Sequence, residues 1–248
     1  TARAVHATMR CLPQPGESVL VIGAESTGLL TMQAVQALAP EGTAITAIAR
    51  HPFQMEMAAR MGATTVIYDE NLSAGVMQST GAQRFQGRRG AELLVGGFDV
   101  VYDSIGSATT LQNAVRWARE GGAVVLVGTR LTPLRLDLTP LWYREVDLLG
   151  AWLHGTENAP SARAAVALGQ DRGGREATFQ IAARLVRERK LTPERLITHR
   201  FPLLELRQAL ATARHKGEHR AIKVMLDMRD PTGLDQPLAG ILADEASE

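Results

Sequence analysis

The sequence predicts a doubly wound α/β fold built on a parallel sheet. Short apolar runs alternate with helical runs of about a dozen residues, and the first apolar run ends in a glycine. That run, at 18–23 (SVLVIG), has no polar alternation, which is typical of a strand buried on both faces. Strands that alternate with helices in this way are joined by right-handed crossovers into a parallel sheet.

The first two-thirds of the chain contains the repeating strand and helix units. Further strands are predicted at 44–49, 64–68, 98–102, 123–127 and 146–153. Helices are predicted at 27–38, 52–61 and 108–119, and the first of these has apolar residues at helical spacing. Gly62 follows the second helix and the pair Gly121-Gly122 follows the third, so these glycines are expected to end the helices.

Two segments interrupt this alternation. Residues 71–97 contain one helix and then a segment rich in Gly and Arg at 87–90, which we interpret as a solvated surface loop. Residues 156–175 form a second irregular region. After it we predict a helix at 177–189, a turn at 191–193, a helix at 204–216 and a strand at 221–227. The acidic, proline-containing residues from Arg229 onward predict a poorly ordered tail.

Composition excludes several classes of protein. The 248 residues carry a formal net charge of +1, which gives no footprint for nucleic acid or for an anionic membrane. No apolar run approaches the length of a membrane span. The single cysteine, Cys11, excludes an internal disulfide framework and a zinc site made of several cysteines. We expect a cytoplasmic protein, and a chain that starts at Thr1 is expected to be a fragment of a longer one.

The junction between the first strand and its helix matches part of a dinucleotide-binding fingerprint. The pattern G-x-G-x-x-G has its first glycine at Gly23 and its third at Gly28, but Glu25 stands in the middle position. The helix that begins with Ser26 and Thr27 would present free N–H groups to a pyrophosphate. Glu25 either points away from the ligand or weakens its binding. The alternative is an ordinary turn with two structural glycines.

The end of the second strand indicates which dinucleotide is bound. An acidic residue there would hold the ribose hydroxyl of NAD, but this chain has Ala49 followed by Arg50 and His51. A small residue leaves room for a 2′-phosphate, and a guanidinium donates two hydrogen bonds to its oxygens. The sequence therefore favours NADP(H) over NAD(H). The alternative is a solvent-exposed arginine at the start of a loop.

Five segments taken together resemble the cofactor domain of the medium-chain dehydrogenase/reductase superfamily, which includes zinc alcohol dehydrogenases and threonine dehydrogenase-like enzymes. These segments are 15–23 (PGESVLVIG), 58–63 (AARMGA), 98–106 (FDVVYDSIG), 121–128 (GGAVVLVG) and 220–224 (RAIKV). The resemblance runs from about Val5 to Asp227. It implies an NAD(P)-dependent oxidoreductase that moves hydride between nicotinamide and an alcohol or carbonyl substrate.

The resemblance also implies a domain organisation. Residues 1–17 would end the linker helix from a GroES-like catalytic domain that the sequence lacks, and 18–200 would form the Rossmann domain. Residues 201–228 would return to the catalytic domain, and 229–248 would be the tail. Zinc, if the enzyme uses it, would be held upstream, so this chain alone is expected to bind no zinc and to be inactive.

The resemblance assigns further cofactor contacts, and no catalytic residue or metal ligand. Residues after the fourth strand would line the adenosine side, the end of the fifth strand would meet the nicotinamide ribose, and the sixth would meet the carboxamide. These are, in the same order, Ser104 and Ile105; Val127, Gly128 and Thr129; and Gly150, Ala151 and Trp152. Lys223 would reach the pyrophosphate, the alternative being an exposed lysine on an edge strand.

Several chemically capable residues are given ordinary structural interpretations. Asp103 is expected to cap a turn rather than to act as an acid or base. Cys11 is expected to be a buried small hydrophobe, and His154 a loop residue. His215 and His219 are four residues apart at a predicted helix end, where they meet the dipole instead of a metal.

Two alternatives to the dehydrogenase remain open, and one assembly is expected. The chain could be a non-catalytic or degenerate dinucleotide-binding module, or part of a zinc-free quinone or enoyl reductase. The alternating leucines at 131–138 and the apolar run at 146–153 predict an extended edge. An unpaired edge of this kind favours association, so we expect a homodimer or a higher symmetric oligomer. Light scattering of Leu136→Lys tests this edge as the interface.

Overall fold

The computed structural model describes residues 1–68, 71–86, 92–158 and 175–228. The chain forms two compact units, 1–193 and 194–248, and each is described by itself. This division falls before the boundary at 200 that the sequence suggested. The predicted surface loop at 87–90 and the predicted tail lie outside the described residues.

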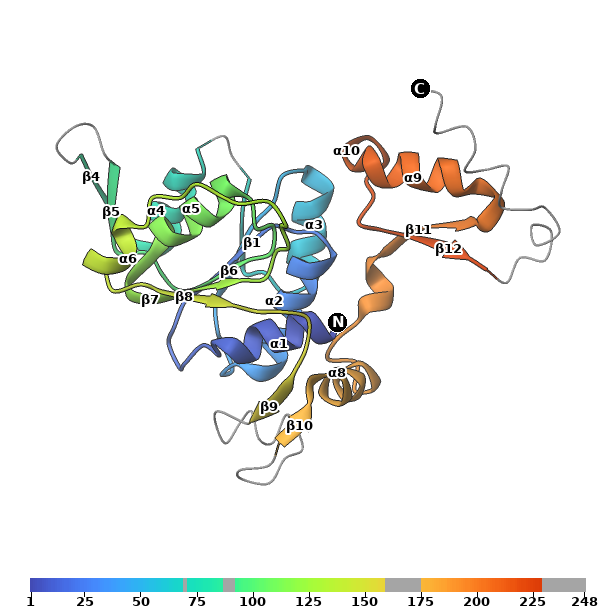
Figure 1. Ribbon diagram of the computed structural model, residues 1–248, viewed down its shortest axis with the longest axis horizontal. Helices are drawn as coiled ribbons and strands as arrows, with labels where there is room; N and C mark the ends of the chain where they lie inside the picture. The colour runs from blue at the N-terminus through green and yellow to red at the C-terminus, as the bar shows by residue number, and fades with distance from the viewer. Residues whose placement is uncertain (69–70, 87–91, 159–174, 229–248) are drawn as a thin grey trace. The chain divides into compact units, whose positions relative to one another are not determined.

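A six-stranded parallel sheet forms the centre of the first unit, with strand order β3-β2-β1-β6-β7-β8 (Figure 1). The strands are β1 (Val19–Ile22), β2 (Ile45–Ile48), β3 (Thr65–Ile67), β6 (Phe98–Asp103), β7 (Ala118–Leu126) and β8 (Asp147–Gly150). The order reverses between β1 and β6, and Ile22 pairs with Asp103 at the carboxyl ends of these strands. This is the crevice in which open α/β sheets bind ligands.

Helices cover both faces of this sheet (Figure 1). On one face, α2 (Ser26–Leu38) and α3 (Pro52–Arg60) follow β1 and β2, with α1 (Ala2–Arg10) against α2 and α8 (Thr178–Arg187) against α1. The other face carries α4 (Leu72–Thr80), α5 (Ala108–Trp117) and α6 (Thr139–Tyr143). All four residues of β1 are buried, as the uninterrupted apolar run predicts. The doubly wound α/β prediction is confirmed.

The fifth strand begins earlier than predicted. Helix α5 ends at Trp117, and the pair Gly121-Gly122, expected to end that helix, lies inside β7. The pairing with β6 shifts register here, and Gly121 has a φ of +65°. The guanidinium of Arg144, 4% exposed, donates to the carbonyl oxygens of Gly96, Arg116 and Ala118 around this bulge. A buried tertiary contact therefore fixes the early part of the strand.

Two antiparallel pairs of short strands were not predicted. Strand β4 (Gln83–Gln86) pairs with β5 (Glu92–Val95), and β9 (Thr156–Asn158) pairs with β10 (Arg175–Ala177). Every residue of β4 is exposed. Strands β4, β9 and β10 are held by backbone hydrogen bonds and have no apolar run that marks them in the sequence, whereas β5 contains the short run 93–95 (LLV) with Leu94 in the core.

The predicted extended edge at 131–138 is wrong, because none of these residues forms a strand. Leu134 and Leu136 are partly buried and pack against the core beneath α5 and α6. Their alternation therefore reflects packing of an irregular segment. The sheet ends at β8, and Leu136→Lys would disturb the core rather than test an interface.

The second unit is a small parallel pair of strands with helices. It contains η2 (Pro193–Leu196), β11 (Ile197–Pro202), η3 (Leu203–Glu205), α9 (Leu206–Arg214), α10 (Lys216–His219) and β12 (Lys223–Asp227). Strand β11 was not predicted, and the predicted helix at 204–216 is divided into three pieces. Helix α9 packs on both strands and its Ala209 is buried, as are Ala221 and Ile222 just before β12. Among the helices of the described residues, none has the length and apolarity needed to cross a bilayer.

Candidate dinucleotide-binding site

The turn between β1 and α2 is closed by two glycines. Gly23 has a φ of +99°, and a Cβ there would lie 2.7 Å from Ser104 Oγ. A Cβ on Gly28 would lie 1.9 Å from the carbonyl oxygen of Gly23. Ser104 Oγ donates to the carbonyl of Ile22 at 2.7 Å and so ties β6 to this turn. The strand, the helix and Ser104 therefore approach as closely as the first and third fingerprint glycines require.

Helix α2 begins at the carboxyl end of β1 and directs its N-terminus towards the crevice. Glu25 is the N-cap residue, has extended backbone angles and is exposed. Ser26 and Thr27 form the first turn and are half-buried. The positive end of this 13-residue helix favours an anion, which fits a pyrophosphate. Glu25 already places a carboxylate at that end, so it is the one feature that opposes the fit.

The end of β2 presents an exposed arginine on a fixed backbone. Ala49 is buried and Arg50 is exposed. The buried Gln54 accepts hydrogen bonds through Oε1 from the N–H groups of Arg50, at 3.1 Å, and His51, at 3.2 Å. The ring of His51 stacks on Phe53 with centroids 5.6 Å apart. The backbone of this turn is therefore held by a core residue.

Asp103, at the end of β6, caps a turn. Its side chain is fully buried, and Oδ1 accepts from the N–H groups of Ile105 and Gly106 at 3.0 and 3.1 Å. Oδ2 accepts from the hydroxyl of Thr110 at 3.0 Å. Burial raises the pKa of Asp103, against the lowering effect of these hydrogen bonds. The turn-capping interpretation of Asp103 is confirmed, and Ile105 is left 47% exposed at the crevice.

The ends of β7 and β8 lie next to one another. Val127 and Gly128 donate backbone hydrogen bonds to the carbonyl of Asp103 at 2.9 and 2.8 Å, and Val127 is buried. Ala151 donates to Leu126 O at 3.1 Å. Gly128 approaches so closely that a Cβ there would lie 2.2 Å from the carbonyl carbon of Ile105. The predicted residues at these strand ends are thus brought together.

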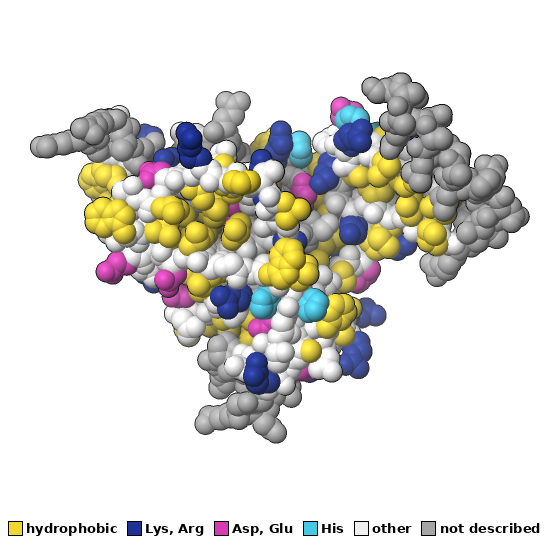
Figure 2. Space-filling model, viewed as in Figure 1, with side chains coloured by type: hydrophobic (Ala, Val, Ile, Leu, Met, Phe, Trp, Pro, Cys, Tyr) yellow, Lys and Arg dark blue, Asp and Glu magenta, His cyan; other side chains and the backbone are white. Residues whose placement is uncertain are grey.

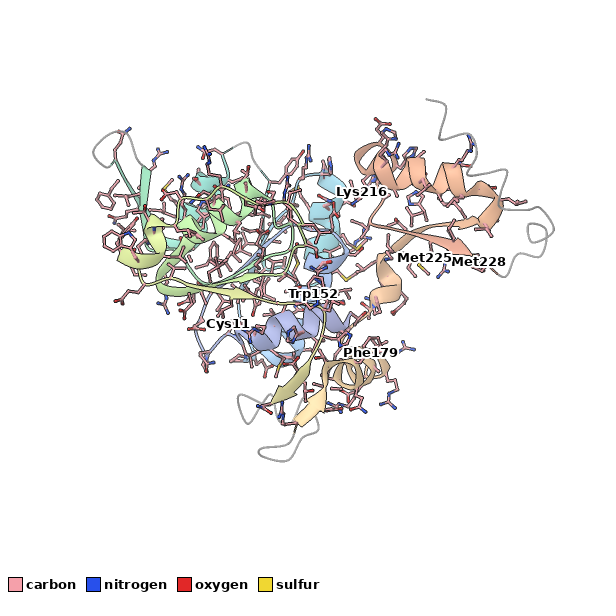
Figure 3. The ribbon with its side chains drawn as sticks, viewed as in Figure 1. Cys11, Trp152, Phe179, Lys216, Met225 and Met228 are labelled. Atoms are coloured by element: carbon pink, nitrogen blue, oxygen red, sulfur yellow. The ribbon has the colours of Figure 1, made fainter. Side chains whose placement is uncertain are left out.

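Beyond Ala151 the chain leaves the sheet with exposed side chains. Gly150 is exposed, and Trp152 is 65% exposed where β8 ends (Figure 3). His154 is exposed as well and makes an edge-on contact with Phe179 of α8. The loop interpretation of His154 therefore holds.

Helix α1 contributes contacts that sequence reasoning missed. The guanidinium of Arg3 donates through Nη2 to the carbonyl of Val127 and to the hydroxyl of Thr129. Arg10 Nε donates to the carbonyl of Gly150 at 3.1 Å. The two arginines are seven positions apart and therefore share one face of the helix. The seven-residue spacing of the two arginines is the sequence signal for these contacts. The sequence interpretation of 1–17 as a linker helix does not use it.

His6 lies between these arginines on α1. His6 Nδ1 is 2.6 Å from Glu157 Oε1, which also accepts from the hydroxyl of Thr178 at 2.6 Å. Both His6 and Glu157 are largely shielded from solvent, with 16% and 8% of their side chains exposed. This contact joins α1 to β9 and α8.

Two predictions about single residues, Lys223 and Cys11, have different outcomes. Lys223 is exposed at the start of β12 in the second unit, so its contact with a pyrophosphate stays a prediction. Cys11 is half-buried rather than buried, and burial raises the pKa of its thiol to about 11, with Glu17 and Asp147 adding to the effect (Figure 3). Within the described ranges, no three His, Cys, Asp or Glu side chains are placed to hold a metal ion. The donor set described here does not fit zinc.

Known proteins share this architecture. The profile of the zinc-binding dehydrogenase family matches residues 27–168. L-idonate 5-dehydrogenase of Vitis vinifera is 28% identical over 233 residues, which cover 90% of this chain and 53% of that protein. The chain thus spans about half the length of this relative.

Two similar solved structures contain a nicotinamide cofactor. An alcohol dehydrogenase of Escherichia coli CFT073, complexed with NADH, has a TM-score of 0.67 at 20% identity. The match covers 90% of this chain and 56% of that protein's chain. A zinc-binding dehydrogenase of Sinorhizobium meliloti 1021 bound to NADP has a TM-score of 0.62 at 23% identity, covering 91% and 56%. These likenesses establish the fold. Because the family profile matches more than half of the residues, the chain belongs to the zinc-binding dehydrogenase family.

Proposed function

We infer that the chain is the cofactor-binding part of an NAD(P)-dependent oxidoreductase that transfers hydride between nicotinamide and an alcohol or carbonyl substrate. The observation that carries this inference is the closure of the Gly23–Gly28 turn on Ser104 at the point where the strand order reverses. Family membership and the dehydrogenase names of the relatives support it.

The residues of the first unit hold and orient the cofactor. The first turn of α2 receives the pyrophosphate, and the end of β2 receives the adenosine ribose. Ser104 and Ile105 flank the adenosine side. The backbone at 127–129 and 150–152 receives the nicotinamide nucleotide. When bound, the cofactor supplies the hydride chemistry, and the fold supplies its position. Zinc, if the whole enzyme uses it, is held by residues outside this chain.

The bound cofactor is NADP(H) in preference to NAD(H). Arg50 is exposed on a backbone that Gln54 fixes, and Ala49 offers no carboxylate to compete for a 2′-phosphate. A guanidinium and a phosphate form a charge-assisted pair, which is worth about 1.5–3 kcal/mol when it is well formed.

Titration of the purified chain with NADPH and with NADH tests this proposal. NADPH is expected to bind more tightly, and Arg50→Ala is expected to weaken it about tenfold while leaving NADH nearly unchanged. Arg60→Ala is the matched control, because Arg60 is exposed at the other end of α3. Equal losses for both cofactors, or tighter binding of NADH by the parent chain, would contradict the preference.

A degenerate dinucleotide-binding module is the second candidate, and Glu25 is the observation that favours it. A carboxylate at the helix N-terminus opposes the pyrophosphate. If neither cofactor binds the parent chain at millimolar concentration but Glu25→Gly restores binding, the module is favoured over the enzyme.

A homo-oligomer in the cytoplasm completes the proposal. Strand β8 is the last strand of the described sheet and supports the assembly, since an edge strand can pair with a second copy. Exposed hydrophobic side chains gather at the end of the molecule that carries α6 (Figure 2). On α6 itself Trp142 is 75% exposed and Tyr143 is 40% exposed. This exposure supports an interface position for Trp142.

A further inference from the structure

Helix α1 carries a positive charge to the carboxyl end of β7. Arg3 extends from the second position of this helix, and Nη2 donates to the carbonyl of Val127 and the hydroxyl of Thr129. Both acceptors lie immediately after the strand. The guanidinium is therefore fixed at the ligand-binding end of the sheet.

The strand order indicates which half of a dinucleotide this charge meets. In a doubly wound sheet the pyrophosphate lies at the first strand-to-helix turn, and the adenosine ribose lies at the end of the next strand outward. Here these are the turn at Gly23 and the end of β2. The second nucleotide must then extend over the other half, which is β6, β7 and β8. Arg3 thus lies at the nicotinamide half, given the proposed function on which this inference rests.

The charge of Arg3 has no anionic partner in the part of the chain that the structure describes. Its two acceptors are neutral, and no carboxylate there forms an ion pair with it. Its Nε is buried without a hydrogen-bond partner. Burial lowers the pKa of Arg3, but a guanidinium stays protonated at neutral pH. Its field is therefore uncompensated at the strand end.

We propose that Arg3 makes this site prefer the reduced cofactor over the oxidised one. The nicotinamide ring carries a positive charge in NADP⁺ and is neutral in NADPH. A fixed cation close to the ring repels the oxidised form and leaves the reduced form nearly unaffected, and partial exclusion of water strengthens this repulsion. Arg3 is a positioning and selecting residue here, with no part in hydride transfer itself.

The test compares the dissociation constants of NADP⁺ and NADPH for the parent chain and three variants. Arg3→Met removes the charge at similar length and Arg3→Lys keeps the charge. Arg60→Met is the control, because Arg60 is an exposed arginine at the end of α3 with no place in the candidate site. The ratio of the NADP⁺ constant to the NADPH constant is expected to fall about threefold to tenfold in Arg3→Met only. The difference is expected to shrink at 1 M salt.

A ligand that lacks the nicotinamide ring separates repulsion between Arg3 and the ring from any other effect of the Arg3 substitutions on binding. Binding of 2′-phospho-ADP-ribose is expected to be the same for the parent chain and Arg3→Met, and thermal melting of each variant checks that it is folded. An unchanged ratio in folded Arg3→Met, or equal tightening of both cofactors, would overturn the proposal. If the parent chain and all variants bind none of the three ligands, the proposed function fails instead.

Discussion

Gln33 and Thr192 exchange two hydrogen bonds across 159 positions of the chain. Gln33 Nε2 donates to Thr192 Oγ1 at 2.8 Å, and the backbone N–H of Thr192 donates to Gln33 Oε1 at 3.0 Å. Both residues are buried, and Leu191 beside them is fully buried. This pair fastens the end of the first unit to α2, the helix that follows the phosphate-binding turn.

Replacing Gln33 with Leu is expected to destabilise the chain by about 2–4 kcal/mol, because it leaves the N–H of Thr192 buried without an acceptor. Urea unfolding measures the effect. Gln36→Leu is the control, since Gln36 is exposed on the same helix and its loss is expected to cost about 0.5 kcal/mol or less. Similar unfolding midpoints for the two variants would contradict the importance of the Gln33–Thr192 pair.

Asp99 is expected to make stability fall in acid. Burial alone would raise the pKa of Asp99, but hydrogen bonds from Arg119 and Ser18 hold it below its ordinary value. A lowered folded pKa stabilises the fold above the unfolded pKa of about 3.9, and this contribution is lost as the pH falls through the folded pKa.

The stability difference between the parent chain and Asp99→Asn is accordingly expected to be largest near pH 7 and to shrink towards pH 3. Denaturant unfolding at several pH values measures it. Asp147→Asn, which alters an exposed carboxylate on β8, serves as the control. A difference that stays constant with pH would show that the ionised form of Asp99 is not the stabilising one.

Cys11 is expected to be unreactive in the folded chain. Burial raises the pKa of its thiol to about 11, so the thiolate is scarce at pH 8. Labelling with a disulfide reagent should be about 100-fold slower than after unfolding in urea, where the pKa returns to about 8.5. The native rate should rise steeply between pH 8 and pH 10. A native rate equal to the unfolded rate would refute this.

Glu25→Gly is expected to tighten the binding of both NADPH and NADH, because it removes a carboxylate from an anion site and restores the fingerprint. Glu25 makes no side-chain cap hydrogen bond, so helix α2 should lose only the favourable interaction of this carboxylate with the helix dipole, about 0.3–1 kcal/mol. Glu25→Gln separates charge from size. Weaker binding by both variants would mean that Glu25 itself contacts the ligand.

Trp142→Glu is expected to convert a dimer to a monomer if the end of the molecule carrying α6 forms the interface. Light scattering at micromolar concentration measures the mass. Phe179→Glu is the control, because Phe179 is similarly exposed, at 65%, on α8. A monomeric parent chain, or a dimeric Trp142→Glu variant, would exclude this interface.

The main sheet could be predicted because its strands are buried on both faces. The run Val19–Ile22 has no polar residue, so its composition alone indicates a central strand. The polar strand β4 could not be found in this way, since backbone pairing does not depend on apolar side chains. The early start of β7 depends on Arg144, which is distant in sequence from the carbonyls it contacts.

For the same physical reason, only some residues of the candidate site could be predicted from the sequence. Gly23 and Gly28 could be identified because a backbone requirement restricts the residue type itself. Arg3 could not be placed from the sequence, because its contact with Val127 exists only once α1 has packed against the unit. The alternation of Leu134 and Leu136 misled the prediction, since leucines that pack onto a core without forming a strand produce the same pattern.

In the turn at the end of β2, one residue holds the backbone and another faces the ligand. Gln54, a core residue, binds the backbone N–H groups of Arg50 and His51, and the His51 side chain completes the capping box and stacks on Phe53. The Arg50 side chain takes no part in these contacts, so it is free to vary during evolution without loss of the turn. A protein designer can likewise exchange Arg50 to retarget the site while the scaffold beneath stays constant.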